Sequence, residues 1–175
     1  MPPHCDSLDG PVVTAAREAL AHEDVELILP FVKKEGEPEV RAAFDLAVKA
    51  RSQGPEAQQV ADRFFFETAV RVHRAGEGAP FTGLKPAGLD VGPVIPIAEK
   101  AIASGSPVEL VDFLTTAVRS EVEARFDAIR DAEKSASGTV DDRRAYVEAV
   151  LGLQVWSHKL YGAMKAGPHA PHGHG

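Results

Sequence analysis

The sequence predicts an all-α protein, a helical bundle of about six to eight helices. Apolar residues recur at helical spacing in segment after segment of the 175 residues, and nearly all secondary-structure signals are helical. Hydrophobic residues make up 44% of the chain and charged residues 26%. This composition is typical of a globular domain and argues against a disordered or collagen-like chain.

Four helices are expected in the first half of the chain, and a proline or a capping residue introduces each one. They span 11–22, 25–29, 38–53 and 55–75, and are introduced by Pro11, Asp24, Pro38 and Pro55. Pro30 interrupts the second helix and Gly54 ends the third. The fourth helix is apolar over more than half of its circumference, so we expect other helices to surround it.

A glycine- and proline-rich segment, 76–91, separates these helices from the second half of the chain. Irregular connections of this length are often functional, and we expect this one to fold over the N-terminal segment as a wall or lid. Three more helices are predicted at 93–104, 107–132 and 142–165. The last ten residues, 166–175, are rich in Gly, Pro and His and should form a flexible tail.

An internal repeat relates the two halves of the chain. Gly10-Pro11-Val12-Val13 returns as Gly92-Pro93-Val94-Ile95, and Val25-Glu26-Leu27 returns as Val108-Glu109-Leu110. The period of about 82 residues predicts a duplicated helical unit with an internal two-fold pseudo-symmetry. We therefore expect a single domain over 1–165, made of repeat units at about 10–75 and 92–165 that the segment 76–91 joins.

Charge, hydropathy and cysteine content exclude several classes of protein. The 19 basic and 26 acidic residues give a formal charge of −7, which argues against a nucleic-acid partner. No apolar run approaches the roughly 18 residues of a membrane helix, so no membrane partner is expected. No secretory signal is visible, which predicts a cytoplasmic protein with a reduced Cys5. One cysteine also excludes an internal disulfide, a Cys-x-x-Cys pair and any zinc site with two cysteines.

A dense group of metal-capable side chains precedes the first repeat: His4, Cys5, Asp6 and Asp9. The lead-in of the second repeat, 85–90, has no cysteine or histidine. A thiolate with an imidazole favours transition metals such as Ni, Cu, Zn or Fe over Mg or Ca. The following helix N-terminus lowers the pKa of a nearby thiol, which makes Cys5 and His4 the candidate catalytic residues. In the alternative interpretation Cys5 is an apolar filler and Asp9 caps a helix.

Two further candidate metal ligands lie on the helix expected at 55–75. Glu67 is flanked by phenylalanines, and a carboxylate buried there needs a partner or a raised pKa; alternatively it forms an ordinary i,i+4 pair with Arg71. His73 precedes the glycine-rich segment, where it can meet His4 or Glu77 at the helix end; alternatively it interacts with the C-terminus of its own helix.

The run His4-Cys5-Asp6 followed by Gly10 resembles the N-terminal hook of nickel superoxide dismutase, an all-helical enzyme with the motif His-Cys-Asp-x-x-Cys-Gly. The resemblance implies a metal bound by the histidine and the cysteine. This sequence departs from the motif because Asp9 stands at the second cysteine position and three residues precede His4. The stretches HCDSLDGPV and FFFETAVRVHRAGEGAPFTGLKPAG look more closely like an uncharacterised bacterial family of helical proteins, which implies no activity.

The leading functional hypothesis is a metal-binding helical protein that acts as a small metal-dependent oxidoreductase, similar to superoxide dismutase. Its cofactor would be Ni, Cu, Zn or Fe, its substrate a small molecule, and its ligands His4, Cys5, Asp6 or Asp9 with Glu67 and His73. The alternative is a non-catalytic helical interaction or small-ligand-binding module in which Cys5 is structural. The wide apolar stripes also fit a homo-oligomer. The tail histidines, His169, His172 and His174, either bind such metals loosely or have no role.

Overall fold

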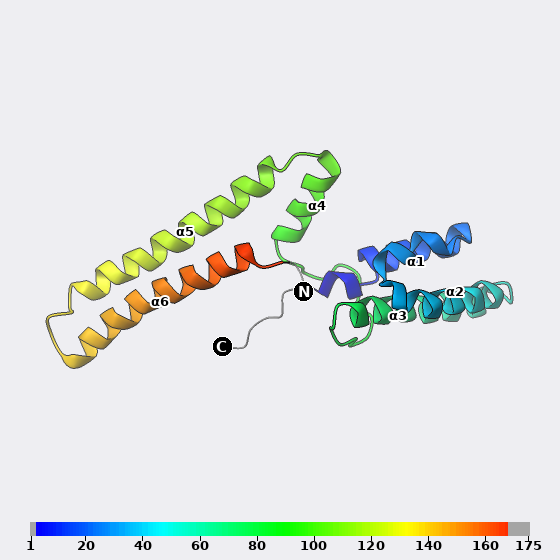
Figure 1. The fold of residues 1–175 in the computed structure, drawn as a ribbon, viewed down its shortest axis with the longest axis horizontal. Coiled ribbons are helices and arrows are strands. Elements are labelled where there is room, and N and C mark those ends of the chain that lie inside the picture. The colour runs from blue at the N-terminus through cyan, green and yellow to red at the C-terminus, as the bar shows by residue number, and fades with distance from the viewer. Residues whose placement is uncertain (1–2, 168–175) are drawn as a thin grey trace. The chain divides into compact units, whose positions relative to one another are not determined.

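The computed structural model describes residues 3–167, and every regular element in that range is helical. The α-helices are α1 (Pro11–His22), α2 (Glu37–Arg51), α3 (Pro55–Gly76), α4 (Val94–Ser104), α5 (Val108–Glu133) and α6 (Val140–Lys165) (Figure 1). Four short 3₁₀ turns are η1 (Pro3–Asp6), η2 (Val25–Leu27), η3 (Leu29–Phe31) and η4 (Lys34–Gly36). The all-α prediction is confirmed. The tail histidines lie outside the described residues.

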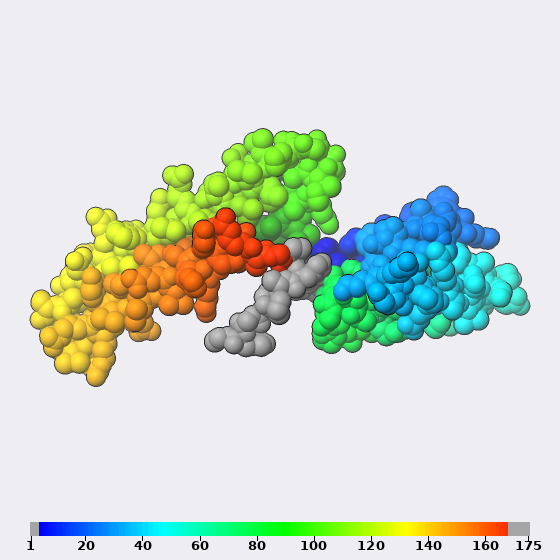
Figure 2. Space-filling view, viewed as in Figure 1, coloured from blue at the N-terminus to red at the C-terminus, as the bar shows by residue number. Residues whose placement is uncertain are grey.

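The chain forms two compact units, residues 1–92 and 93–175. In Figure 2 the first unit runs from blue to green and the second from green to red. The sequence predicts one domain over 1–165, whereas the contacts divide the chain at the start of the expected second repeat unit. The physical reason is that the first unit closes a hydrophobic core of its own. The internal two-fold symmetry stays a prediction.

The core of unit 1 is built around α3, which packs against both α1 and α2. Phe65 of α3 is fully buried, and its ring meets that of Phe44 on α2 edge to face at 5.5 Å between centroids. Val12, Val13 and Leu20 bring the apolar side of α1 into the same core. The helix expected to be central therefore is central in its unit.

Two differences from the predicted helices have local causes, a proline in one case and a capping box in the other. The expected helix over 25–29 is wrong: the chain forms consecutive 3₁₀ turns there, because Pro30 removes a backbone donor from any continuous α-helix. Helix α6 begins at Val140 rather than at 142, because Thr139 and Asp142 form a reciprocal capping box.

Unit 2 is a helical hairpin with one additional helix. Helices α5 and α6 lie side by side in antiparallel directions, and α4 packs against α5 (Figure 1). In the described part of this unit no side chain is as buried as those of the unit 1 core. Within residues 3–167, no helix combines the length and hydropathy needed to cross a membrane.

Candidate functional site

The N-terminal segment is held in place by the glycine- and proline-rich segment, as the sequence predicts. Ser7 and Lys85 form an isolated parallel bridge. The Leu8 N–H donates to the backbone carbonyl oxygen of Lys85 at 3.0 Å, and the Lys85 N–H donates to the backbone carbonyl oxygen of Asp6 at 2.8 Å. Phe81 and Leu84 of the same segment pack against the unit 1 core. Backbone pairing therefore fixes the end of η1 to segment 76–91, and apolar contacts fix that segment to the unit 1 core.

Cys5 is a buried member of this core, with 8% of its surface exposed. Burial raises the pKa of its thiol, and the negative charge of Glu77 raises it further. This direction is opposite to the lowering expected from a helix N-terminus. His4 lies beside the thiol, with Nε2 at 3.9 Å from Sγ. The environment favours a neutral, packed thiol over a nucleophilic thiolate.

Asp6 is engaged in a buried ion pair with Arg74 of α3. The Arg74 Nε and Nη2 atoms donate to the two carboxylate oxygens at 2.6 and 2.8 Å, and both side chains are almost fully buried. The hydrogen bonds from Arg74 to Asp6 raise the pKa of the guanidinium. Both carboxylate oxygens are thus used by the protein itself. Sequence reasoning missed Arg74, because no local pattern links residues 68 positions apart.

Asp9 fastens the glycine- and proline-rich segment to the start of α1. Its Oδ2 accepts a hydrogen bond from the Gly88 backbone N–H at 2.7 Å. This bond, together with one from Ser7, lowers the pKa of the Asp9 carboxyl. The side chain is exposed and its contacts stabilise the loop, so it does not act as the helix cap considered from the sequence.

Glu67 and His73 have partners of their own on or near α3. Glu67 is 42% exposed and accepts a hydrogen bond from Arg63 at 3.0 Å, so the ordinary i,i+4 pair exists with a different arginine. His73 Nδ1 lies 2.7 Å from the Phe31 carbonyl oxygen. Because a carbonyl only accepts, Nδ1 carries the hydrogen. The other ring nitrogen, Nε2, lies 3.3 Å from Glu77 Oε1.

The structure brings only part of the predicted metal site together. His4, Cys5 and Asp6 are consecutive residues of η1, but Asp6 is committed to Arg74. Among residues 3–167, no group of three or more His, Cys, Asp or Glu side chains is arranged to hold a metal ion. Metal ligation by His4, Cys5, Asp6, Asp9, Glu67 and His73 stays a prediction.

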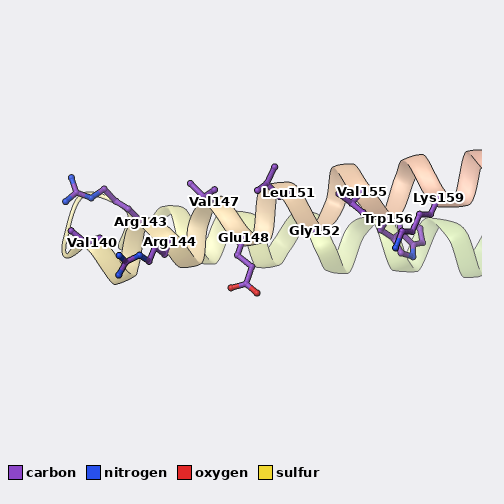
Figure 3. Close-up of a pocket in the computed structure, with 10 residues that line it drawn as sticks. All are labelled: Val140, Arg143, Arg144, Val147, Glu148, Leu151, Gly152, Val155, Trp156 and Lys159. Atoms are coloured by element: carbon purple, nitrogen blue, oxygen red, sulfur yellow. The ribbon is translucent and has the colours of Figure 1, made fainter. Parts of the chain in front are cut away.

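A second candidate site lies on α6 and was not singled out from the sequence. Its core is four half-exposed side chains, which we call the α6 stripe: Val140, Val147, Leu151 and Val155. They line an open face of α6, with a volume of about 750 Å³, whose lining also includes Arg143, Arg144, Glu148 and Lys159 (Figure 3). Val147 and Leu151 point to the same side of the helix in this view.

The opposite side of α6 packs on α5. Trp156 lies under the guanidinium of Arg125, with 4.6 Å from Cζ to the ring centroid. Leu153 is partly buried beside it and lines the same small cleft between the two helices. Leu151 and Leu153 are two residues apart and so lie about 200° apart around the helix. Helix α6 therefore has an apolar side that meets α5 and a second, nearly opposite, apolar side.

Residues 9–156 match a protein family described as Family of unknown function (DUF6448). No curated protein and no solved structure matches the chain. The matched range contains the whole α6 stripe and begins after His4, Cys5 and Asp6.

Removing the buried carboxylate should destabilise unit 1 strongly. We expect Asp6→Ala to lower the free energy of unfolding by about 3–5 kcal/mol, because Arg74 is left buried without its counter-ion. Urea unfolding followed by circular dichroism measures the change. The control Arg63→Ala breaks the exposed pair with Glu67 and should cost only about 0.2–0.5 kcal/mol. Equal costs for the two variants would contradict the structural role of Asp6.

The buried thiol should make stability depend on alkaline pH. Because the folded-state pKa of Cys5 is raised, its contribution is complete below the unfolded thiol pKa of about 8.5 and is lost as pH rises through the folded pKa. The free energy of unfolding of the native chain, measured relative to Cys5→Ala, should therefore stay constant up to about pH 8 and fall as the pH rises further. A difference that stays constant to about pH 10 would contradict the raised pKa of the Cys5 thiol.

Proposed function

The chain belongs to the DUF6448 family, whose function is unknown, and we propose that it is a non-catalytic helical interaction module whose docking surface is the α6 stripe. The observation that carries this proposal is the second apolar side of α6. An amphipathic surface helix has one apolar side, facing its own core. Here Val147, Leu151 and Val155, at i, i+4 and i+8, lie on the side away from α5 and are each 51% exposed.

The openness of this face supports a helical partner. Its lining residues all belong to α6, from Val140 to Lys159, whereas sites for small ligands are enclosed clefts that bury most of the ligand. A helix that packs on such a face contacts residues spaced by three and four, as the stripe is. The charged residues of the lining can then pair with charges beside the apolar side of that helix.

The N-terminal segment supports the same proposal because its polar side chains are engaged in structural contacts within the protein. The buried ion pair uses Asp6, a backbone hydrogen bond uses Asp9, and burial keeps Cys5 protonated. These contacts fit the interpretation in which Cys5 is structural. We also propose a cytoplasmic location, where a single thiol stays reduced, and no nucleic-acid partner, which the formal charge of −7 supports.

Metal binding at His4 and Cys5 is a second candidate function, favoured by one observation. The His4 Nδ1 atom is buried and has no hydrogen-bond partner in the described structure, and its ring lies beside the Cys5 thiol. A thiolate and an imidazole suit Ni, Cu, Zn or Fe. A metal held there would make the chain a candidate oxidoreductase acting on a small molecule.

Photo-crosslinking tests the interaction module directly. A photoreactive phenylalanine derivative in place of Leu151 should give products heavier than one chain in cells, because a partner covers the α6 stripe. The matched control carries the same group in place of Ile102 on α4, which is 82% exposed and lies outside the stripe. Crosslinks from Leu151 that stay within one chain would contradict the proposal.

Elemental analysis tests the second candidate. The chain is expressed with Ni, Cu, Zn and Fe supplied, both in full and ending at Lys165 to remove the tail histidines. Metal binding at the N-terminal segment predicts about one metal ion per chain in both forms and loss of that metal in Cys5→Ser. Less than about 0.1 metal ion per chain in both forms would rule the site out.

A further inference from the structure

We propose that the partner on the α6 stripe is an acidic amphipathic helix of a different protein, with carboxylates flanking its apolar side. This inference rests on the proposed function and names the chemistry of its partner. Three observations carry it: the cations that flank the stripe, the helix that covers the corresponding side of α3 in unit 1, and the length of the uncovered face.

Two cations that have no acidic partner within the described part of unit 2 flank the α6 stripe. None of the ion pairs among these residues uses Arg143 or Lys159. Arg143 lies eight residues before Leu151 and Lys159 eight residues after it, so they stand about 80° to either side of the stripe. Figure 3 shows them at opposite ends of the stripe. A helix that packs along the stripe would therefore meet a positive charge on each of its sides.

The other charged residues of the lining leave this face basic. Arg144 pairs with Asp141 at 2.6 Å, and the two side chains are 75% and 86% exposed, so the pair contributes little and Arg144 stays accessible. Glu148 is the one carboxylate of the lining, against three basic residues. The chain as a whole has a formal charge of −7. A partner with carboxylates complements this basic face, whereas a second α6 would set like charges against each other.

Unit 1 shows what covers the corresponding side of α3. In the predicted repeat, the segment FFETAV at 65–70 returns as YVEAVL at 146–151, so Phe66 and Val70 correspond to two residues of the α6 stripe. Phe66 is 6% exposed and Val70 is fully buried. Arg17 of α1 lies over the Phe66 ring, with 5.3 Å from Cζ to the ring centroid, and α1 packs on α3. The corresponding side of α3 is therefore covered by a helix.

Helix α4, the counterpart of α1 in the repeat, does not match the α6 stripe. It packs on α5, and only residues 105–107 connect these two helices. The lining of the stripe runs from Val140 to Lys159, about 29 Å along α6, whereas the eleven residues of α4 span about 16 Å. The charges of α4, Glu99 and Lys100, cancel. Even α4 of a second copy thus supplies neither the length nor the negative charge.

These features define the partner helix. Its apolar residues are spaced by three and four, so that they contact Val147, Leu151 and Val155. Its carboxylates lie about sixteen residues apart, because sixteen residues separate Arg143 from Lys159. Sixteen residues turn a helix through about 160°, which places the two carboxylates on opposite flanks of its apolar side.

Two synthetic peptides test this chemistry with the full chain. Both are amphipathic helices of about 20 residues with the same leucines, and they carry either Glu or Lys on the flanks of the apolar side. We expect the Glu peptide to bind with at least a tenfold lower Kd than the Lys peptide at low salt. The difference should shrink at about 0.5 M salt, because salt screens exposed charges. Fluorescence anisotropy of labelled peptides measures both Kd values.

Charge reversal provides matched variants. The double variant Arg143→Glu, Lys159→Glu should abolish or reverse the preference for the Glu peptide. The control Arg119→Glu, Arg130→Glu makes the same change in net charge at two exposed positions of α5 outside the lining, and should keep the preference. Leu151→Asp should raise the Kd of the Glu peptide at least tenfold. Circular dichroism verifies that all variants remain helical.

Two results would overturn the inference: a Kd for the Glu peptide that is no lower than that for the Lys peptide, or binding of neither peptide at about 100 μM. A crosslinked product of about 37 kDa from Leu151, twice the 18.6 kDa of one chain, identifies a second copy and also overturns it.

These failures are distinct from failure of the proposed function. Equal Kd values that both rise in Leu151→Asp keep the docking surface and reject only the acidic partner. Binding of the Glu peptide that Leu151→Asp leaves unchanged rejects the stripe as well as the inference. If neither peptide binds, the inference fails, and crosslinking from Leu151 still decides whether the stripe is a docking surface.

Discussion

The buried ion pair between Asp6 and Arg74 organises the first unit. It joins η1 to the last turns of α3, and the residues on either side of Asp6 follow from that anchor: Cys5 enters the core and Ser7 pairs with Lys85. A single charge in this environment would be costly, so each partner requires the other. Cys5, the side chain that looks most reactive in the sequence, is consequently buried, and its thiol stays protonated.

The second unit is governed by a different constraint, the lack of a closed core. Two antiparallel helices can bury only the sides that face each other, and α6 has apolar side chains on two nearly opposite sides. Trp156 and Leu153 meet α5, while the α6 stripe meets water. The hydrophobic effect favours covering such a surface. For this reason we place the proposed docking surface on unit 2.

The helices could be predicted from the sequence because hydrophobic periodicity and capping are local properties of the chain. Prolines at 11 and 55 begin α1 and α3 as predicted, whereas Pro30 and the Thr139 capping box shifted boundaries that periodicity alone had placed. The packing of segment 76–91 on the N-terminal segment was predicted, but the ion pair with Arg74 was not, because Arg74 lies 68 positions from Asp6 in the sequence. The sequence shows the apolar residues of the α6 stripe but does not show that they lack a partner. Their exposure depends on which side of α6 packs on α5, and only the structure shows that side.

The central claim is that the α6 stripe is a docking surface, and crosslinking from the stripe tests this claim most directly. A photoreactive group at Leu151, which is 51% exposed, should give products heavier than one chain, whereas the same group at Ile102 on α4, which is 82% exposed, should not. Crosslinks from Leu151 that stay within one chain would contradict the account.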